Sequence, residues 1–354
     1  MKENNKRYAL ILAGGKGSRL WPISTTNKPK QYLNLYSNNI MINETIKRIE
    51  SIFEYDNIFV ITNIDQKELA ERYIDNRIPR ENIIFEPMSK NTAMCIFYAS
   101  IKILEQRGNG TITILSSDHY IDETEKLLNN IEEGIELANK EENLVTIGIK
   151  PTYPATGFGY IKYNYDDNLT CHIVEEFKAQ PIYEKAREYI ESGKYYWNSG
   201  MFIWKITSIL KNYKEFLPEI YKYKEQIANS IRNGKDVLQN IYKDVESISI
   251  DKGILEKSNK IKMVKGEFNW LDIGSINDFF KIQEKDFNNN VKKGNLITED
   301  IENCSIYNDD NRAVIAVVGV KDLNIINSNN VILIANKDKM GELPNLIEKI
   351  KCDN

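Results

Sequence analysis

The stretch LAGGKGSRL at residues 12–20 directly follows the apolar run YALI at residues 8–11. A glycine-rich turn after a buried strand exposes backbone N–H groups that can hold phosphate. The dinucleotide-binding loop G-x-G-x-x-G requires a third glycine, and Leu20 stands in that place. The P-loop ends in Gly-Lys-Ser/Thr, whereas Gly17 is followed here by Ser18 and Arg19. The sequence therefore indicates a phosphate-binding turn of neither common type.

Two cations follow the turn, Arg19 and Lys30, and Pro22 and Pro29 restrict the chain between them. A guanidinium contacts phosphate oxygens in pairs, and an ammonium supplies a point charge. For the glycines alone, an ordinary strand-to-loop turn explains the sequence as well as a phosphate site does. The two cations favour phosphate.

Short apolar runs alternate with helical patterns through the first half of the chain. We expect strands at residues 8–12, 57–62, 82–85, 111–115 and 144–149, and helices at residues 43–52, 65–75, 92–106 and 123–142. Such alternation predicts parallel βαβ units, which bind ligands at the carboxyl ends of their strands. The glycine turn and Asp118 both lie at such ends.

The pattern changes after Pro151. Antiparallel strands are expected at residues 160–165 and 170–177 around a turn at residues 166–168, followed by a helix at 183–192 and a polar helical stretch at 205–240. Beyond about residue 285, short β runs separated by Asn and Asp predict a small β domain. These runs leave open a β-solenoid or a short sandwich. We expect two domains, at residues 1–285 and 286–354.

Composition excludes several classes of protein. The net charge of −4 provides no basic field for nucleic acid. Four scattered cysteines form no CxxC pair, and two histidines are too few for a His-rich metal site. The sequence shows no signal segment and no apolar run of the roughly 18 residues that a membrane span needs. We expect a cytoplasmic protein with reduced thiols and no nucleic-acid or membrane partner.

Two aspartates are candidate metal ligands. Asp118 follows the strand expected at residues 111–115, and Asp272 lies in the stretch NWLDIG at residues 269–274. Mg²⁺ prefers one or two carboxylates together with phosphate oxygens and water. Each aspartate alone is better explained as a cap or turn residue. Their combination with the glycine turn favours Mg²⁺.

Ordered blocks of the sequence can be compared with known families. The first blocks are LAGGKGSRLWPIS with NKPKQYL (12–33), EP with NTA (86–93), SDH (117–119) and PATGFGYI (154–161). The others are WNSGMF (197–202), SIDK with LEK (249–257), and Trp270, Asp272, Gly274 and Ser275. In this order the blocks resemble the nucleotidyltransferases that activate sugar 1-phosphates, and they are most similar to the mannose-1-phosphate guanylyltransferase branch. The resemblance extends from about residue 7 to residue 340.

The resemblance implies a Rossmann-like α/β nucleotidyltransferase domain with a mixed, mainly parallel sheet, and a small C-terminal β domain, commonly a short left-handed β-helix. It implies that a sugar 1-phosphate, expected to be mannose 1-phosphate, attacks the α-phosphate of GTP with Mg²⁺ as cofactor. Pyrophosphate leaves and a GDP-sugar forms, expected to be GDP-mannose, a polysaccharide precursor. Because no covalent enzyme intermediate is expected, positioning and charge neutralisation would supply the catalysis. The sequence leaves the nucleotide base and the oligomeric state open, with a homodimer as the working expectation.

The resemblance also assigns roles to residues. The catalytic group consists of Arg19 on the leaving pyrophosphate, Lys30 on the α-phosphate and the incoming phosphate, and Asp118. The nucleotide-binding group consists of Leu12, Ala13, Gly14, Gly15, Gly17, Asn91, Thr92 and Asp118. Asp118 and Asp272 would hold the metal, and Gly159 and Asn198 would line the sugar pocket. For Asp251, a helix N-cap explains the residue at least as well as a ligand role.

The part of the sequence that is expected to bind the acceptor sugar departs from the family pattern. The usual Phe-Val-Glu-Lys-Pro is Phe177–Pro181 here, with Ala179 in place of the glutamate that binds sugar hydroxyls and Gln180 in place of the lysine. Ala155 replaces a further glutamate. If the strand register differs, Glu175, Glu176 or Lys178 could substitute, and Glu176 is the candidate chosen for the sugar ligand. A hydrogen bond to a charged group contributes about 1.5–3 kcal/mol. The alternatives are therefore transfer to a different phosphorylated acceptor or from another nucleotide, and, with less support, a non-catalytic nucleotide-sugar sensor.

Overall fold

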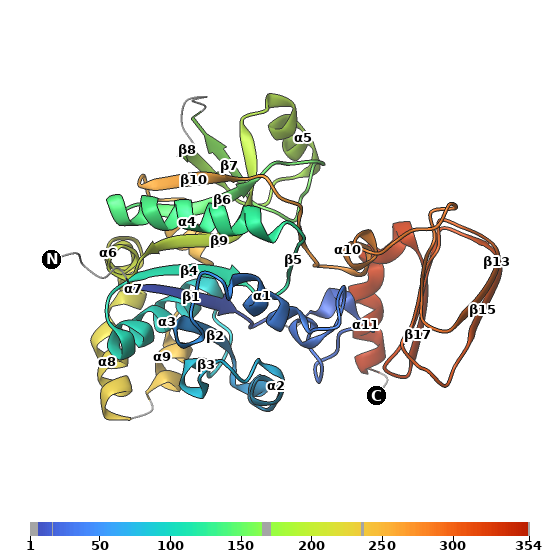
Figure 1. Ribbon diagram of the computed structural model, residues 1–354, viewed down its shortest axis with the longest axis horizontal. Coiled ribbons are helices and arrows are strands. Elements are labelled where there is room, and N and C mark those ends of the chain that lie inside the picture. Colours follow the sequence, from blue (N-terminus) through green and yellow to red (C-terminus); the bar gives the residue numbers. More distant parts are fainter. Residues whose placement is uncertain (1–5, 16, 165–170, 235–236, 353–354) are drawn as a thin grey trace. The chain divides into compact units, whose positions relative to one another are not determined.

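The computed structural model describes residues 6–15, 17–164, 171–234 and 237–352 (Figure 1). The chain forms two compact units, each built from segments that are distant in sequence. The first unit contains Ile42–Ser117, Ile121–Trp270 and the residues up to Gly14. The second contains Gly15–Met41, Asp118–Tyr120 and the residues from Leu271 onward. The expected turn at residues 166–168 lies outside the described residues, and the domain division at residue 285 stays a prediction.

A nine-stranded sheet, in the order β3-β2-β1-β4-β9-β6-β10-β8-β7, forms the centre of the first unit (Figure 1). Its strands are β1 (Arg7–Leu12), β2 (Ile58–Asn63), β3 (Ile83–Glu86), β4 (Thr111–Ser116), β6 (Leu144–Ile149), β7 (Tyr160–Tyr163), β8 (Cys171–Lys178), β9 (Tyr195–Lys205) and β10 (Ile261–Gly266). The pairs β1–β2, β1–β4, β2–β3 and β6–β10 are parallel. Among the described strands of this sheet, β8 and β9 run against the rest. The predicted mixed, mainly parallel sheet is confirmed.

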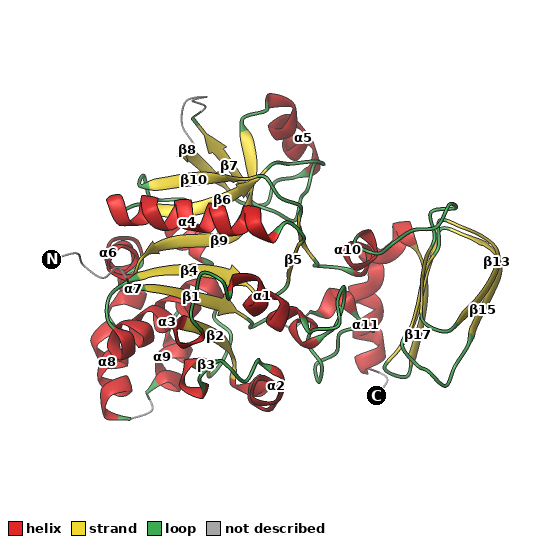
Figure 2. Cartoon of the chain, in the orientation of Figure 1, coloured by secondary structure: helices red, strands yellow, loops and turns green. Residues whose placement is uncertain are grey.

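Helices flank this sheet (Figure 2). They are α1 (Met41–Ile49), α2 (Lys67–Tyr73), α3 (Asn91–Arg107), α4 (Thr124–Lys140), α5 (Tyr183–Ser192), α6 (Ile206–Phe216), α7 (Pro218–Tyr221), α8 (Lys224–Asn233) and α9 (Leu238–Asp244). In α4, Leu127, Ile131 and Ile135 are buried at four-residue spacing, so one stripe of the helix packs on the sheet. The polar stretch expected to be helical is divided into α6, α7, α8 and the start of α9. Among the described residues, none of the helices has the length and apolarity required to cross a bilayer.

A buried acidic side chain lies at the end of β3. Glu86 Oε1 accepts a 2.9 Å hydrogen bond from the Tyr242 hydroxyl, and Glu86 also shares a hydrogen bond with Cys95. Burial raises the pKa of the Glu86 carboxyl from 4.5 to about 7, against the opposing effect of these two hydrogen bonds. In the folded protein Glu86 therefore stays protonated in mildly acidic solution and ionises only near neutral pH.

We expect Glu86→Gln to remove a pH-dependent loss of stability. Because the folded pKa of Glu86 lies above the unfolded value, the folded chain binds more protons between pH 4.5 and about pH 7. The free energy of unfolding of the wild type therefore falls as pH rises through this window, by on the order of 3 kcal/mol. Thermal unfolding at about pH 5 and about pH 8 measures the effect. A Tm difference between variant and wild type that is equal at both pH values would contradict it.

The second unit is dominated by a β-helix. One sheet has the order β12-β14-β16-β17 and the other pairs β13 with β15. The strands are β12 (Val291–Lys293), β13 (Leu296–Glu302), β14 (Ser305–Asn308), β15 (Ile315–Lys321), β16 (Leu323–Ser328) and β17 (Val331–Asn336). The pairs β12–β14, β14–β16 and β13–β15 are parallel, as in successive coils of a solenoid. Of the two architectures left open, the solenoid is confirmed, and its left hand stays a prediction.

Asparagine and aspartate form corners of this β-helix. Asn303 and Asp322 have φ values of 50° and 58°, and Asn303 Nδ2 donates to Asp322 Oδ1 at 2.6 Å. Short polar side chains tolerate this left-handed backbone better than bulky ones do. At Gly294, with φ 100°, a Cβ would lie 2.0 Å from the Asn308 carbonyl oxygen. These requirements explain why the short β runs are separated by Asn, Asp and Gly.

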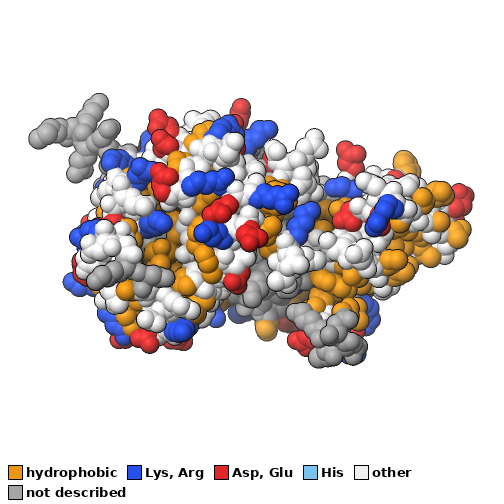
Figure 3. Space-filling view, turned by 90° about the horizontal axis from the view of Figure 1, so that it is seen from below, with side chains coloured by type: hydrophobic (Ala, Val, Ile, Leu, Met, Phe, Trp, Pro, Cys, Tyr) orange, Lys and Arg blue, Asp and Glu red, His pale blue; other side chains and the backbone are white. Residues whose placement is uncertain are grey.

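The interior of the second unit joins its sequence segments. Leu20 and Ile23 share a buried cluster with Phe279 of α10 (Ile276–Lys281) and Leu343 of α11 (Leu343–Cys352). The region around the glycine turn therefore packs against residues from the end of the chain. The outer surface of the β-helix retains aliphatic side chains such as Val318, and hydrophobic side chains are visible among charged ones in Figure 3.

Candidate active site

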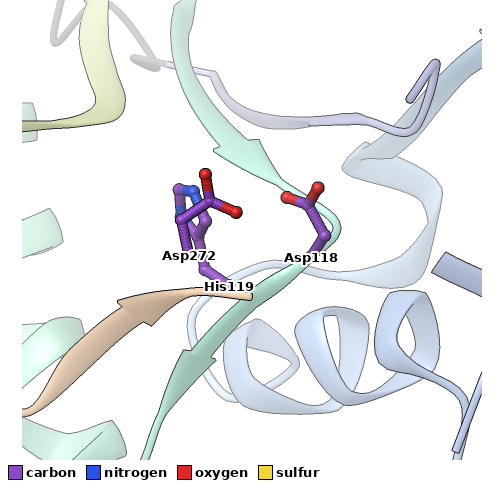
Figure 4. A group of neighbouring side chains, drawn as sticks. All are labelled: Asp118, His119 and Asp272. Carbon is purple, nitrogen blue, oxygen red and sulfur yellow. The ribbon is translucent and has the colours of Figure 1, made fainter. Parts of the chain in front are cut away.

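Three predicted residues from distant parts of the sequence meet in the second unit. Lys30 Nζ lies 2.6 Å from Asp118 Oδ2 and 3.2 Å from Asp272 Oδ1, and it donates to the Ile273 carbonyl oxygen at 2.9 Å. Asp118 follows β4, and Asp272 ends the short strand β11 (Trp270–Asp272), which pairs with β5 (His119–Ile121). Figure 4 shows the two carboxylates facing a common space.

The charge of Lys30 is set by opposing effects. Burial disfavours the ammonium form, because the side chain is only 9% exposed. The carboxylates of Asp118 and Asp272 outweigh this effect and raise the pKa of Lys30 above its usual value. Lys30 is therefore a fixed cation at neutral pH, held in place by three oxygen acceptors. Preorganised charge of this kind stabilises phosphate without reorganisation during reaction.

Gly17 is required by the path of the turn. Its φ is +64°, and a Cβ there would lie 2.6 Å from Ser24 Oγ and 3.1 Å from Lys30 Cβ. The glycine therefore lets the turn pack directly against Lys30. A Cβ at Gly15 would meet no atom of the described residues within 4 Å, so packing does not require glycine there. Lys16, between the two, lies outside the described residues.

Arg19 lies near the same backbone as Lys30. Its guanidinium Nη2 is 3.4 Å from the position that a Cβ on Gly274 would occupy, next to the Ile273 carbonyl that Lys30 binds. Arg19 is exposed, whereas Lys30 is buried. An exposed guanidinium beside a buried ammonium offers one mobile and one fixed cation for a chain of phosphates.

The donor set fits Mg²⁺ through its two carboxylates. Asp118, His119 and Asp272 each offer a ligand atom, and these atoms lie within 4.8 Å of one another (Figure 4). Carboxylate oxygens are preferred Mg²⁺ ligands, whereas imidazole suits transition metals better. The sequence assigned no role to His119, although its place directly after Asp118 was an available signal. We expect Asp118 and Asp272 to hold Mg²⁺ and His119 to lie beside it.

In the first unit, the predicted nucleotide-binding residue Leu12 ends β1, and Ala13 and Gly14 follow it. Ala13 N donates to the Ile61 carbonyl oxygen at 2.8 Å, and the Ala13 carbonyl accepts from Thr62 Oγ1 at 2.9 Å. The neighbouring strand β2 therefore fixes the chain just before the glycines. A Cβ at Gly14 would meet no described atom within 4 Å, which leaves this backbone approachable.

Asn91 and Thr92 form the start of α3. Asn91 has φ 64°, and its Oδ1 accepts from Thr92 N at 2.8 Å. Thr92 Oγ1 accepts a 2.9 Å hydrogen bond from Ile250 N. The Thr92 hydroxyl therefore anchors the segment before Asp251, and the start of α3 presents N–H groups suited to an anion.

The predicted sugar-pocket residues Gly159 and Asn198 are brought together. Asn198 N donates to the Gly159 carbonyl oxygen at 2.8 Å, and a Cβ on Gly159 would lie 3.6 Å from Asn198 Cβ. Asn198 Nδ2 also donates to Asp251 Oδ1 at 2.7 Å. The N-cap interpretation of Asp251 is wrong, because Ile250 holds the cap position and Asp251 begins a π-helical turn.

The strand register does not place Glu176 beside Gly159 and Asn198. Tyr160 pairs with Lys178 across β7 and β8, so Ala179 stands at the register position beside Gly159. Glu176 lies opposite Lys162, three residues earlier on β8, and its carboxylate is 3.4 Å from Lys178 Nζ. The register therefore places Ala179, and not Glu176, beside Gly159.

Gln180 has a contact that the sequence did not predict. Its Nε2 donates to the Gly157 carbonyl oxygen at 2.9 Å. The amide thus ties the end of β8 to the PATGFGYI segment, which leads into Gly159. A lysine at this position would be free to reach a phosphate, whereas the glutamine amide is used within the protein.

Comparisons with known proteins agree with this architecture. Residues 8–289 match the family model described as nucleotidyl transferase, and residues 294–350 match the MannoseP isomerase/GMP-like beta-helix domain. A mannose-1-phosphate guanylyltransferase of Salmonella montevideo is 33% identical, over 98% of this chain and 74% of that protein. One from Klebsiella pneumoniae is 32% identical, over 97% and 73%.

A solved structure is similar along nearly its whole length. It is described as mannose-1-phosphate geranyltransferase from Thermus thermophilus, and it is 27% identical with a TM-score of 0.88, over 98% of this chain and 99% of that one. The resemblance seen in the ordered sequence blocks is confirmed. Both parts of the chain match in order, and the relatives exceed 30% identity, so the chain belongs to the nucleotidyl transferase family, in its mannose-1-phosphate guanylyltransferase branch.

Proposed function

We propose that this chain transfers a guanylyl group from GTP to mannose 1-phosphate, releasing pyrophosphate and forming GDP-mannose in the presence of Mg²⁺. The observation that carries the proposal is the position of Lys30, fixed between Asp118 and Asp272. The names of the relatives support the guanine nucleotide and mannose 1-phosphate, rather than another acceptor or a non-catalytic sensor.

Lys30 and Arg19 suit the transfer of a nucleotidyl group. An oxygen of the sugar 1-phosphate attacks the α-phosphorus, and the bond from that phosphorus to the leaving pyrophosphate breaks. A phosphate monoester has a second pKa of about 6, so the attacking group is already ionised and needs no general base. Lys30 neutralises the reacting phosphates, and Arg19 binds the departing pyrophosphate.

Mg²⁺, when bound by Asp118 and Asp272, supplies further charge neutralisation on the phosphate oxygens.

We also propose a cytoplasmic location, which the free, buried thiols of Cys95 and Cys304 support, because unpaired cysteines are typical of reducing compartments. The homodimer stays a prediction.

A pyrophosphate-release assay tests the function. Purified protein with GTP, Mg²⁺ and mannose 1-phosphate should release pyrophosphate and GDP-mannose in equal amounts, and EDTA should stop the reaction until Mg²⁺ is restored. If no pyrophosphate is released with any of a panel of nucleoside triphosphates and phosphorylated acceptors, the assignment as an enzyme is overturned. Release with a different acceptor alone would overturn only mannose 1-phosphate.

Ala179→Glu is expected to lower the KM for mannose 1-phosphate about tenfold or more. The register places this position beside Gly159, and a carboxylate there adds a charged acceptor for sugar hydroxyls. The KM for GTP should change little, and Ala179→Gln, with an uncharged acceptor of similar size, should give a smaller gain. An unchanged KM for the acceptor in Ala179→Glu would show that this position does not contact the sugar.

A further inference from the structure

In the first unit, the Asp251 carboxylate and the Asn198 amide form a hydrogen-bonded pair next to Gly159. Asn198 Nδ2 donates to Asp251 Oδ1 at 2.7 Å, and Asn198 Oδ1 accepts from Gly200 N at 3.1 Å. These bonds fix which end of the Asn198 amide faces Asp251. Both residues are partly buried, so the fold around them holds the pair in place.

The backbone of Asp251 is anchored on both sides. Ile250 N donates to Thr92 Oγ1 at 2.9 Å, and the Asp251 carbonyl accepts from Glu256 N at 2.8 Å. Asp251 begins a π-helical turn, Asp251–Leu255, a rare geometry that is frequent at functional sites. A Cβ at Gly253 in this turn would lie 2.8 Å from Leu217 Cδ1, so the turn is closely packed. The carboxylate is therefore presented to Asn198 by a fixed backbone.

The pair retains unused hydrogen-bonding capacity. An amide NH₂ has two donor hydrogens, of which Asp251 takes one, and a carboxylate has about four lone-pair sites, of which Asn198 occupies one. Burial raises the pKa of Asp251, and hydrogen bonds from its own backbone N–H and from Asn198 oppose that rise. Further donors to this carboxylate would stabilise its charged form.

We propose that Asp251 and Asn198 together bind two adjacent hydroxyls of the acceptor sugar. One hydroxyl donates to Asp251, and its neighbour accepts from the remaining Asn198 N–H. Gly159, whose carbonyl accepts from Asn198 N, has no side chain to obstruct this approach. The inference rests on the proposed function for the class of acceptor, a sugar 1-phosphate with two adjacent hydroxyls, and makes Asp251 a specificity-determining residue.

Calorimetric binding of mannose 1-phosphate to wild type, Asp251→Asn and Glu246→Gln tests the pair without requiring turnover. Asp251→Asn keeps the shape of the side chain, and it should weaken sugar phosphate binding at least tenfold while changing GTP affinity less than about twofold. Glu246→Gln, at an exposed carboxylate of the same segment, should match the wild type. Equal affinity of Asp251→Asn and wild type would overturn the proposal, as would equal losses for GTP and sugar phosphate or no binding by the wild type.

Deoxy analogues provide a test on the unaltered protein. Removing each of two adjacent hydroxyls in turn from mannose 1-phosphate should weaken binding to the wild type, and Asp251→Asn should be insensitive to one of these removals. A variant that loses as much as the wild type with every analogue would overturn the pair as a sugar ligand. Pyrophosphate release is measured separately, so binding through Asp251 without turnover would refute the proposed function and leave this inference standing.

Discussion

Lys30→Met should lower kcat for pyrophosphate release by about a thousandfold. Removing one preorganised donor from a site of developing charge costs about 10²–10³ in kcat. Lys30 is a fixed cation that contacts both candidate metal ligands, so its loss affects the phosphates and the carboxylates together. The variant retains a side chain of similar length and removes only the charge.

The same variant should be less stable without Mg²⁺. Asp118 and Asp272 would then face each other without Lys30, and like charges in proximity are unfavourable. Added Mg²⁺ should therefore raise the Tm of Lys30→Met more than it raises that of the wild type. Lys28→Met, at an exposed lysine two residues earlier, is the matched control and should resemble the wild type in both measurements. A fall in kcat of less than about tenfold would contradict the role given to Lys30.

Asp118→Asn should abolish turnover more completely than nucleotide binding. We expect kcat to fall by about 10³ or more, while the affinity for GTP changes less than about tenfold, because the other residues proposed to bind the nucleotide are unchanged. The substitution removes a metal ligand and also the ion pair at 2.6 Å that does most to keep Lys30 charged in its buried position.

Parallel measurement of kcat and GTP affinity separates these effects. Asp122→Asn, at an exposed aspartate four residues later, is the control for a general effect of lost charge. Loss of nucleotide affinity as large as the loss of kcat would contradict a role for Asp118 in the reacting state. Rescue of Asp118→Asn by Mg²⁺ in excess would indicate that the metal site is weakened rather than removed.

The sequence predicted the sheet well because local patterns carry the required information. The hydrophobic periodicity of a strand or an amphipathic helix indicates which of its residues are buried. Residues 144–149 and 183–192 accordingly form the expected elements with the expected boundaries. The position of β9 between β4 and β6 depends on contacts between distant segments, so local periodicity does not encode it. The same holds for the choice of solenoid over sandwich, which the parallel registers of β12, β14 and β16 decide.

The candidate site likewise depends on contacts between distant segments, which local sequence patterns do not predict. Lys30 and Asp272 are 242 residues apart, and their meeting followed from the family resemblance rather than from any local pattern. The partner of Asn198, 53 residues away at Asp251, was misread because an aspartate before a helical turn is commonly an N-cap. The prediction for Glu176 depended on the register of β7 and β8, which local periodicity does not encode.

The shared interior of residues 15–41 and the end of the chain has a consequence for biosynthesis. Leu20 and Ile23 are made early, yet they pack with Phe279 and Leu343, which are synthesised much later. The strands of the large sheet are complete once Gly266 has been made, but Asp272 and the hydrophobic partners of the glycine-turn segment are not. The group formed by Lys30, Asp118 and Asp272 therefore comes together only after every strand of the large sheet has been made.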